Sequence, residues 1–117
     1  MQAVLRIWAL PPVALDAAAE FHARWAPEAE AALAEAPPDY ALLIVMPEAD
    51  HTHGEWRLAA IRMLARTAAP ARVNLVGCDS PDGIARFAEY LERAPGVTGQ
   101  YLPANAQLAI RLPGEAA

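Results

Sequence analysis

The densest group of polar side chains in this sequence lies in residues 50–53, which read Asp-His-Thr-His. Two imidazoles in one loop can bind a metal ion together, with a carboxylate as third ligand. His51 and His53 are therefore candidate metal ligands, although His22 lies far along the chain and no second His pair follows. The alternative is a solvated loop in which the Asp or Thr caps the following helix. We favour this alternative and expect no bound metal.

Cys78 is the only cysteine of the chain and follows a predicted strand. It could approach His51 or His53 across the edge of a sheet, which would place a thiol and a base in one crevice. A free cysteine at the end of a strand more often packs as a small buried side chain, and we favour that interpretation. A single cysteine forms no internal disulfide, which suits a reducing compartment.

These side chains must be positioned by strands and helices that alternate along the chain. The predicted strands cover residues 4–8, 40–46, 72–76 and 107–112. The predicted helices cover residues 16–36, 55–68 and 81–94. The continuous apolar run of residues 40–46 indicates a central strand covered on both faces. Asp16 and Ser80 are the expected helix caps, and Pro27 should kink or split the first helix.

The order βαβαβαβ predicts an α/β fold with three layers, built on a small, mostly parallel four-stranded sheet with right-handed crossovers. The composition does not change enough along residues 1–117 to divide them into two domains. On the helix of residues 55–68, the periodicity places one set of side chains inward and the arginines outward or at the edges. The inward set is Leu58, Ile61, Met63, Leu64 and Ala65, and the arginines are Arg57, Arg62 and Arg66.

Composition excludes several kinds of partner. The formal net charge is -5, and the basic residues are all arginines spread singly along the chain, so we expect no nucleic-acid partner. No apolar stretch approaches the length of a membrane span, and the N-terminus lacks the features of a signal peptide. We therefore expect no membrane association and a cytoplasmic protein.

Two short phrases stand in an informative order in the second half of the chain. Residues 65–74 read A-R-T-A-A-P-A-R-V-N, and residues 97–100 read V-T-G-Q. They resemble the C-terminal half of short-chain dehydrogenase/reductases (SDRs), in which a helix ending in "LA-x-EL-AP" runs into an "RVN" strand and "VTGQ" precedes the last strand. The resemblance is strongest over residues 40–100. It implies a Rossmann-like half domain whose strands correspond to the fourth through seventh of the parent fold.

The functional motifs of that family have no counterpart here. No Gly-rich turn, which would bind the cofactor pyrophosphate, occurs upstream of Gly54. Along the matching helix, Asp50 stands where the family has its catalytic Tyr, and Gly54 stands where it has its Lys. The Pro-Gly that follows the "RVN" strand is replaced by residues 77–79, Gly-Cys-Asp. From this resemblance we expect no catalytic residue, no NAD(P) cofactor and no enzymatic activity.

The expected layers favour a role in protein association over a role in catalysis. Two helices are expected on one face of the sheet and only one on the other, so part of the sheet is left uncovered. In the resembling family, the two paired helices commonly form a four-helix bundle with a second subunit. We therefore expect a homodimer or a heterodimer with an SDR-family protein, and the expected interface residues are Trp25, Trp56, Arg57 and Met63. The alternative is a small enzyme or a ligand- or metal-binding module that uses the crevice of His51, His53 and Cys78.

Overall fold

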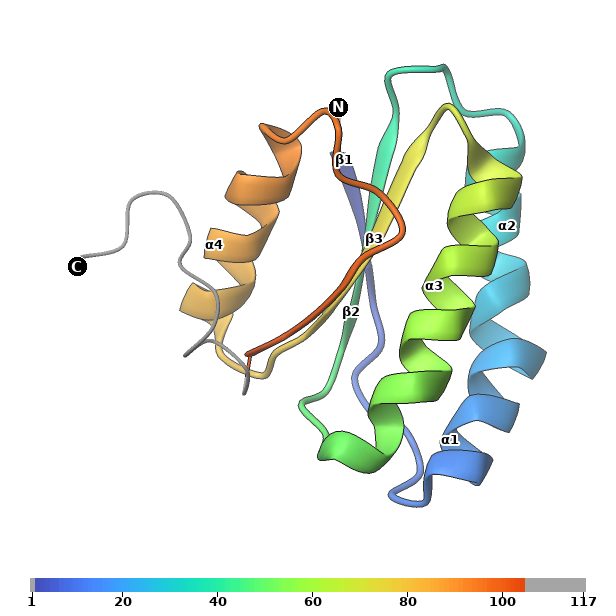
Figure 1. Ribbon diagram of the computed structural model, residues 1–117, viewed down its shortest axis with the longest axis vertical. Coiled ribbons are helices and arrows are strands. Elements are labelled where there is room, and N and C mark those ends of the chain that lie inside the picture. Colours follow the sequence, from blue (N-terminus) through green and yellow to red (C-terminus); the bar gives the residue numbers. More distant parts are fainter. Residues whose placement is uncertain (1, 105–117) are drawn as a thin grey trace.

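The computed structural model describes residues 2–104 and contains a four-stranded parallel sheet (Figure 1). The strands are β1 (Gln2–Arg6), β2 (Ala41–Met46), β3 (Arg72–Gly77) and β4 (Tyr101–Pro103). Their order in space is β1-β2-β3-β4, the same as their order in the sequence. The predicted α/β fold with a parallel four-stranded sheet is confirmed.

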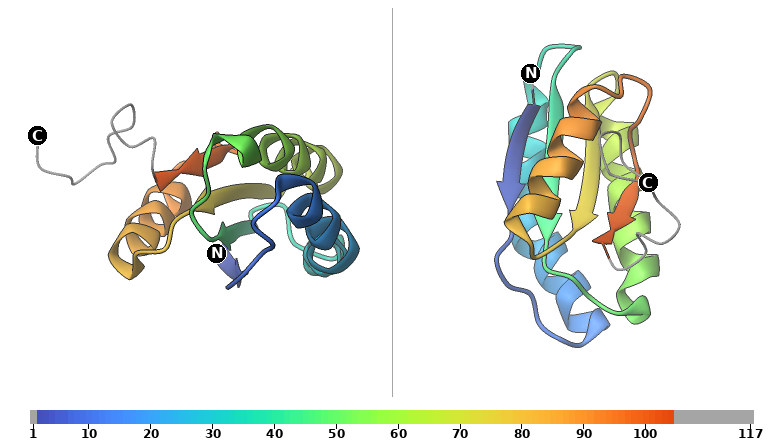
Figure 2. Two further views of the ribbon diagram at one scale, coloured as in Figure 1. Left: turned by 90° about the horizontal axis from the view of Figure 1, so that it is seen from below. Right: turned by 90° about the vertical axis from the view of Figure 1, so that its left-hand side faces the viewer.

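Helices connect the strands and cover both faces of the sheet (Figure 2). The first crossover is one long helical stretch, made of α1 (Ala14–Glu20), the π-helical turn η1 (Phe21–Trp25) and α2 (Ala26–Ala34). The others contain the 3-10 turn η2 (His51–His53) with α3 (Gly54–Ala68), and α4 (Pro81–Glu92). Within residues 2–104, no helix is long and apolar enough to cross a membrane.

The first helical stretch differs from its prediction at its start and in its middle. Asp16 lies within the first turn of α1, and the N-cap residue is Val13. Pro27 does not split the stretch, because the wide turn η1 comes just before it. A proline ring clashes with the carbonyl four residues earlier, and a π-helical turn accommodates that clash while the chain stays helical. At α4, the predicted cap is confirmed, since the Ser80 hydroxyl accepts a hydrogen bond from the N–H of Gly83.

The fourth strand begins directly after the V-T-G-Q phrase. Gly99 has a positive φ of 72°, and its N–H donates to the carbonyl of Val73 at 2.8 Å. The next residue, Gln100, accepts a hydrogen bond from the N–H of Leu75 at 2.9 Å. The turn at Gly99, favourable for glycine, therefore aligns β4 with β3. The strand predicted over residues 107–112 lies outside the described residues.

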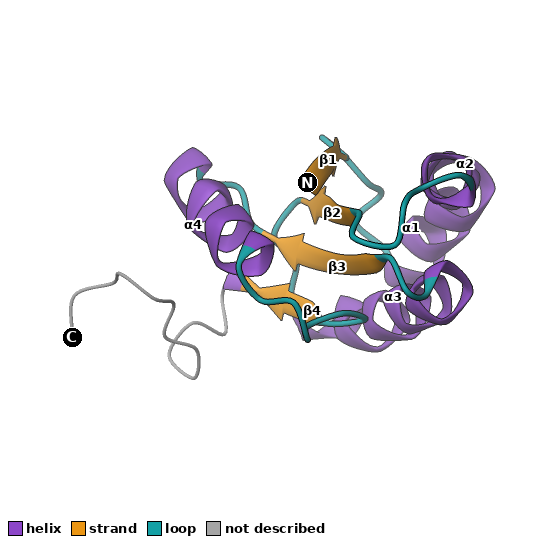
Figure 3. Cartoon of the chain, turned by 90° about the horizontal axis from the view of Figure 1, so that it is seen from above, coloured by secondary structure: helices purple, strands orange, loops and turns teal. Residues whose placement is uncertain are grey.

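The two faces of the sheet are covered unequally, as Figure 3 shows. The α1–α2 stretch and α3 lie side by side on one face, over a large core that includes Phe21, Ile44 and Ile61. On the other face, α4 covers a smaller core around Leu43 and Phe87. On this face α4 does not cover the sheet completely, since Val4 of β1 is 53% exposed.

Candidate functional site

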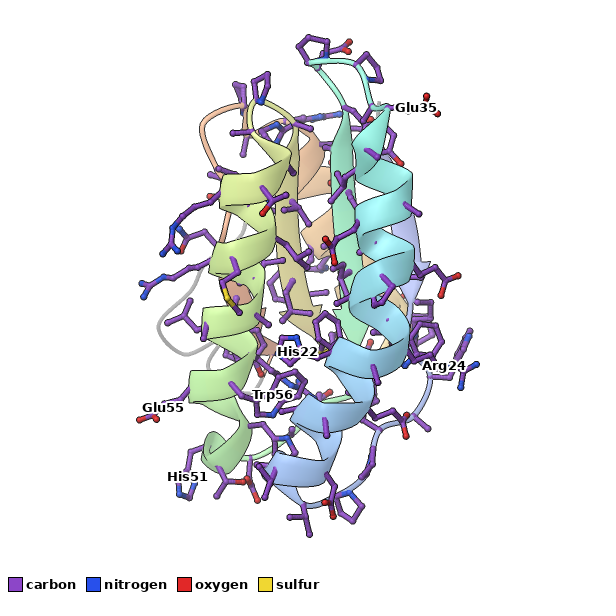
Figure 4. All side chains as sticks on the ribbon, turned by 90° about the vertical axis from the view of Figure 1, so that its right-hand side faces the viewer. His22, Arg24, Glu35, His51, Glu55 and Trp56 are labelled. Carbon is purple, nitrogen blue, oxygen red and sulfur yellow. The ribbon has the colours of Figure 1, made fainter. Side chains whose placement is uncertain are left out.

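The loop between β2 and α3 begins with a capping carboxylate. The carboxylate of Asp50 accepts hydrogen bonds from the hydroxyl and from the backbone N–H of Thr52, the latter at 3.0 Å. These two hydrogen bonds, led by that of the Thr52 hydroxyl, lower the pKa of Asp50. Asp50 thus caps the 3-10 turn η2, whereas α3 itself begins after His53 without a side-chain cap, so the predicted cap acts one turn earlier than expected. Asp50 and His51 are exposed, and Figure 4 shows His51 at the outer end of the helix.

His53 is buried, with only 5% of its surface exposed, so the prediction of a solvated loop is wrong for this residue. Its Nδ1 lies 3.1 Å from the indole N–H of Trp56, and its Nε2 lies 3.0 Å from the carbonyl of Pro12. Because the indole can only donate, Nδ1 accepts and Nε2 carries the proton. Both ring nitrogens are thus engaged. Within residues 2–104, no three His, Cys, Asp or Glu side chains gather closely enough to hold a metal ion.

Cys78 lies on the other face of the sheet from His53. It packs under α4 with Leu43 and Phe87, and its sulfur lies 3.6 Å from the carbonyl of Ser80. Burial raises the pKa of the thiol. His53, by contrast, packs against Trp56 at the start of α3. The structure therefore does not bring His51, His53 and Cys78 together into one crevice.

Arg57 was expected at the outer face or edge of its helix, but it is 1% exposed. Its Nη1 donates to the carbonyl of Pro47 at 2.9 Å and to the hydroxyl of Tyr101 at 3.3 Å. A Cβ on Gly77 would lie 2.9 Å from the same nitrogen. The guanidinium thus occupies space beside Gly77 and links the ends of β2, β3 and β4. Helical periodicity missed it, because a charged residue near the start of a helix is ordinarily solvated.

The other expected interface residues differ in their surroundings. Trp56 is half-buried and packs against Phe21, with ring centroids 5.7 Å apart, between α3 and the first helical stretch (Figure 4). Trp25 is also half-buried, and the guanidinium of Arg24 lies 4.4 Å from the centre of its ring. Met63, which was expected to point inward, is 51% exposed.

An apolar groove runs along the outer surface between α2 and α3. Its larger part has a volume of about 530 Å³ and its smaller part about 180 Å³. Both parts share Glu30, Leu64 and Thr67, so they are continuous. The remaining lining residues are mostly small or apolar: Phe21, His22, Ala26, Pro27, Ala31, Leu33, Ala34, Ala60, Met63 and Ala68. The sequence analysis did not find this groove, because it depends on how alanines of two separate helices face each other.

Glu30 is the charged residue of α2 that lines this groove. On α2, Glu28 and Glu30 are exposed, and the helix contains no basic residue. On α3, Arg62 and Arg66 are exposed. Arg62 and Arg66 do not line the groove, and the backbone of Arg62 lies beside Gly99, at the turn before β4.

Comparison with known families gives one match. A family model described as short chain dehydrogenase-like protein (SDR-like) matches residues 5–104. No curated protein and no solved structure matches the chain. The matched range includes α1 to α4 and the strands β2 to β4, which agrees with the resemblance of the V-T-G-Q and R-V-N phrases. The chain thus belongs to the SDR-like family of short chain dehydrogenase-like proteins.

Proposed function

We propose that this chain acts by protein association, through the groove between α2 and α3, with a second copy of itself or with an SDR-family protein. The apolar groove is the observation that carries the proposal. Small side chains let a partner helix approach its floor closely, and Met63 at its side is half-exposed in the single chain. Covering these groups removes apolar surface from water, which favours association.

A two-fold arrangement of two copies would cover the grooves of both copies at once. In such a dimer, α2 of one copy can lie against α3 of the other. Of the residues expected at the interface, Met63 lines the groove and Trp25 and Trp56 do not, whereas Arg57 is buried and offers no contact surface.

We further propose that the chain does not catalyse hydride transfer. Asp50, at the position of the family's catalytic Tyr, accepts two hydrogen bonds from Thr52 at the start of a helix. Gly54, at the position of the family's Lys, offers no side chain to hold a nicotinamide ribose. Neither residue can supply the proton and the cation that the resembling enzymes use.

The association can be tested with a pair of matched variants on α2. Ala31 is exposed and lines the groove, whereas Ala32 is exposed and does not line it. Ala31→Arg places a long charged side chain where a partner must pack, so we expect the dimer to dissociate into monomers. Ala32→Arg makes the same chemical change on the same helix and should leave the dimer intact. Sedimentation velocity measures both.

Two results would contradict this proposal. One is a parent chain that stays monomeric at high concentration and co-purifies with no SDR-family protein. The other is a dimer that Ala31→Arg leaves unchanged. Trp56→Glu is unsuitable as a test, because Trp56 packs against Phe21 and donates to His53 within one chain, so its replacement would also destabilise the fold.

A further inference from the structure

The open edge of β1 offers a second contact surface, separate from the α2–α3 groove. β1 pairs with β2 alone and lies at the end of the sheet. In a strand, the backbone N–H and C=O groups of successive residues point alternately to the two sides. Ile7 donates to Val45 of β2 at 2.8 Å, so the backbone groups of Gln2, Val4 and Arg6 point to the open edge.

The side chains of these three residues lie on the less covered face. Their neighbours Ala3, Leu5 and Ile7 pack into the core beneath α1–α2, and side chains alternate between the faces of a sheet. The amide of Gln2 donates to the carbonyl of Ala88 in α4, which places Gln2 on the α4 side. Residues 2–104 leave this strip partly uncovered, since Val4 is 53% exposed.

The edge has one feature that usually discourages strand pairing, the charged side chain of Arg6. The five residues of β1 include no proline and no acidic residue. The Arg6 side chain stacks on Trp8, with 4.1 Å between its guanidinium carbon and the ring centre. Trp8 is itself 76% exposed. Apart from the charge of Arg6, the residues of β1 therefore do not oppose pairing of this edge with another strand.

We infer that the occupant is β1 of a second copy, paired antiparallel around a two-fold axis at Val4. The open residues Gln2, Val4 and Arg6 are symmetric about Val4, so this register lets each of them exchange backbone hydrogen bonds with the other copy. Val4 then meets Val4 at the axis, an apolar cross-strand pair. The register also sets Gln2 opposite Arg6.

The side chains favour the register centred on Val4 over a register centred on Arg6. The amide nitrogen of Gln2 is used by Ala88, and its amide oxygen can accept from the Arg6 guanidinium of the other copy. A register centred on Arg6 would bring two guanidinium groups together, and like charges directly opposite each other are destabilising. Pairing about Val4 would join two sheets into one continuous eight-stranded sheet, with Trp8 beside the junction.

Val4→Pro tests the pairing without removing a backbone hydrogen bond between β1 and β2. Proline removes the N–H of Val4, which points away from β2, and proline is tolerated in edge strands in that orientation. We expect Val4→Pro to abolish the β1 contact and Val4→Thr, which keeps both the N–H and a branched side chain, to preserve it. Sedimentation measures the association, and circular dichroism confirms that each variant is folded.

Amide hydrogen exchange of the parent chain gives a second measurement that needs no variant. The N–H groups of Val4 and Arg6 should become protected as the protein concentration rises, together with the formation of the dimer. Rapid exchange of both amides at all concentrations at which a dimer exists overturns the inference. Protection that does not depend on concentration also overturns it, because another part of the same chain would then cover the edge.

The β1 contact and the contact through the α2–α3 groove can be tested independently of each other. Ala31→Arg should leave the concentration-dependent protection of Val4 and Arg6 unchanged, and Val4→Pro should leave the α2–α3 contact unchanged. If both contacts form, each single variant reduces a larger assembly to a dimer, and the double variant yields monomers. If the parent chain forms only one of the two contacts, the missing contact identifies which proposal has failed.

Discussion

At the scale of single residues, Cys78 is a buried residue that packs under α4. Burial raises its pKa, so the reactive thiolate forms only at higher pH than in an unfolded chain. We expect a thiol reagent at neutral pH to modify the native protein at least about tenfold more slowly than the urea-unfolded protein. Equal rates in the two states would show that the thiol is accessible, contrary to its position under α4.

The same shift predicts a dependence of stability on pH. Because the folded pKa is raised, the unfolded chain loses the thiol proton first, and its deprotonation favours unfolding. The contribution of Cys78 is therefore fully present below the unfolded thiol pKa and is lost as the pH rises through the folded one. Comparison of urea unfolding of the parent and of Cys78→Ala across the alkaline range measures it: only the parent should show this loss.

At the scale of the elements, His53 connects the start of α3 to the segment that precedes α1. Its removal leaves the indole N–H of Trp56 and the carbonyl of Pro12 without these partners. We expect His53→Ala to lower the free energy of unfolding by about 1–3 kcal/mol. The exposed His51 serves as control, and His51→Ala should change it by no more than about 0.5 kcal/mol. Equal losses in urea unfolding would contradict the role of His53 as a connection.

The sequence predicted elements better than it predicted burial. The apolar run of β2 and the Ser-Pro-Asp start of α4 each had a local cause, so both were found. Arg57 and His53 are buried beside hydrogen-bond partners that are distant in sequence, Tyr101 and Pro12. Periodicity along one helix contains no information about such partners. For the same reason it misplaced Met63 and did not find the groove between α2 and α3.

At the scale of the whole molecule, the chain is predicted not to bind NAD(H) or NADP(H). The motivation is the lack of a Gly-rich turn upstream of Gly54 and the replacement of the family's Tyr and Lys by Asp50 and Gly54. Titration of either cofactor, followed by calorimetry and nicotinamide fluorescence, should give no saturable signal. Saturable binding at micromolar concentrations, or hydride transfer to a carbonyl substrate, would overturn this prediction.

The strands lie in the sheet in the same order as they occur in the sequence. This order affects how the sheet can form while the chain is being synthesised. Each strand that leaves the ribosome pairs with the strand made just before it, and no later strand has to insert between two that are already joined. A sheet in which the order reverses must wait for distant segments before its centre is complete, which slows folding. Here β2 can dock on β1, and β3 on β2, in the order of translation, so a partly synthesised chain already holds a correctly ordered part of the final sheet.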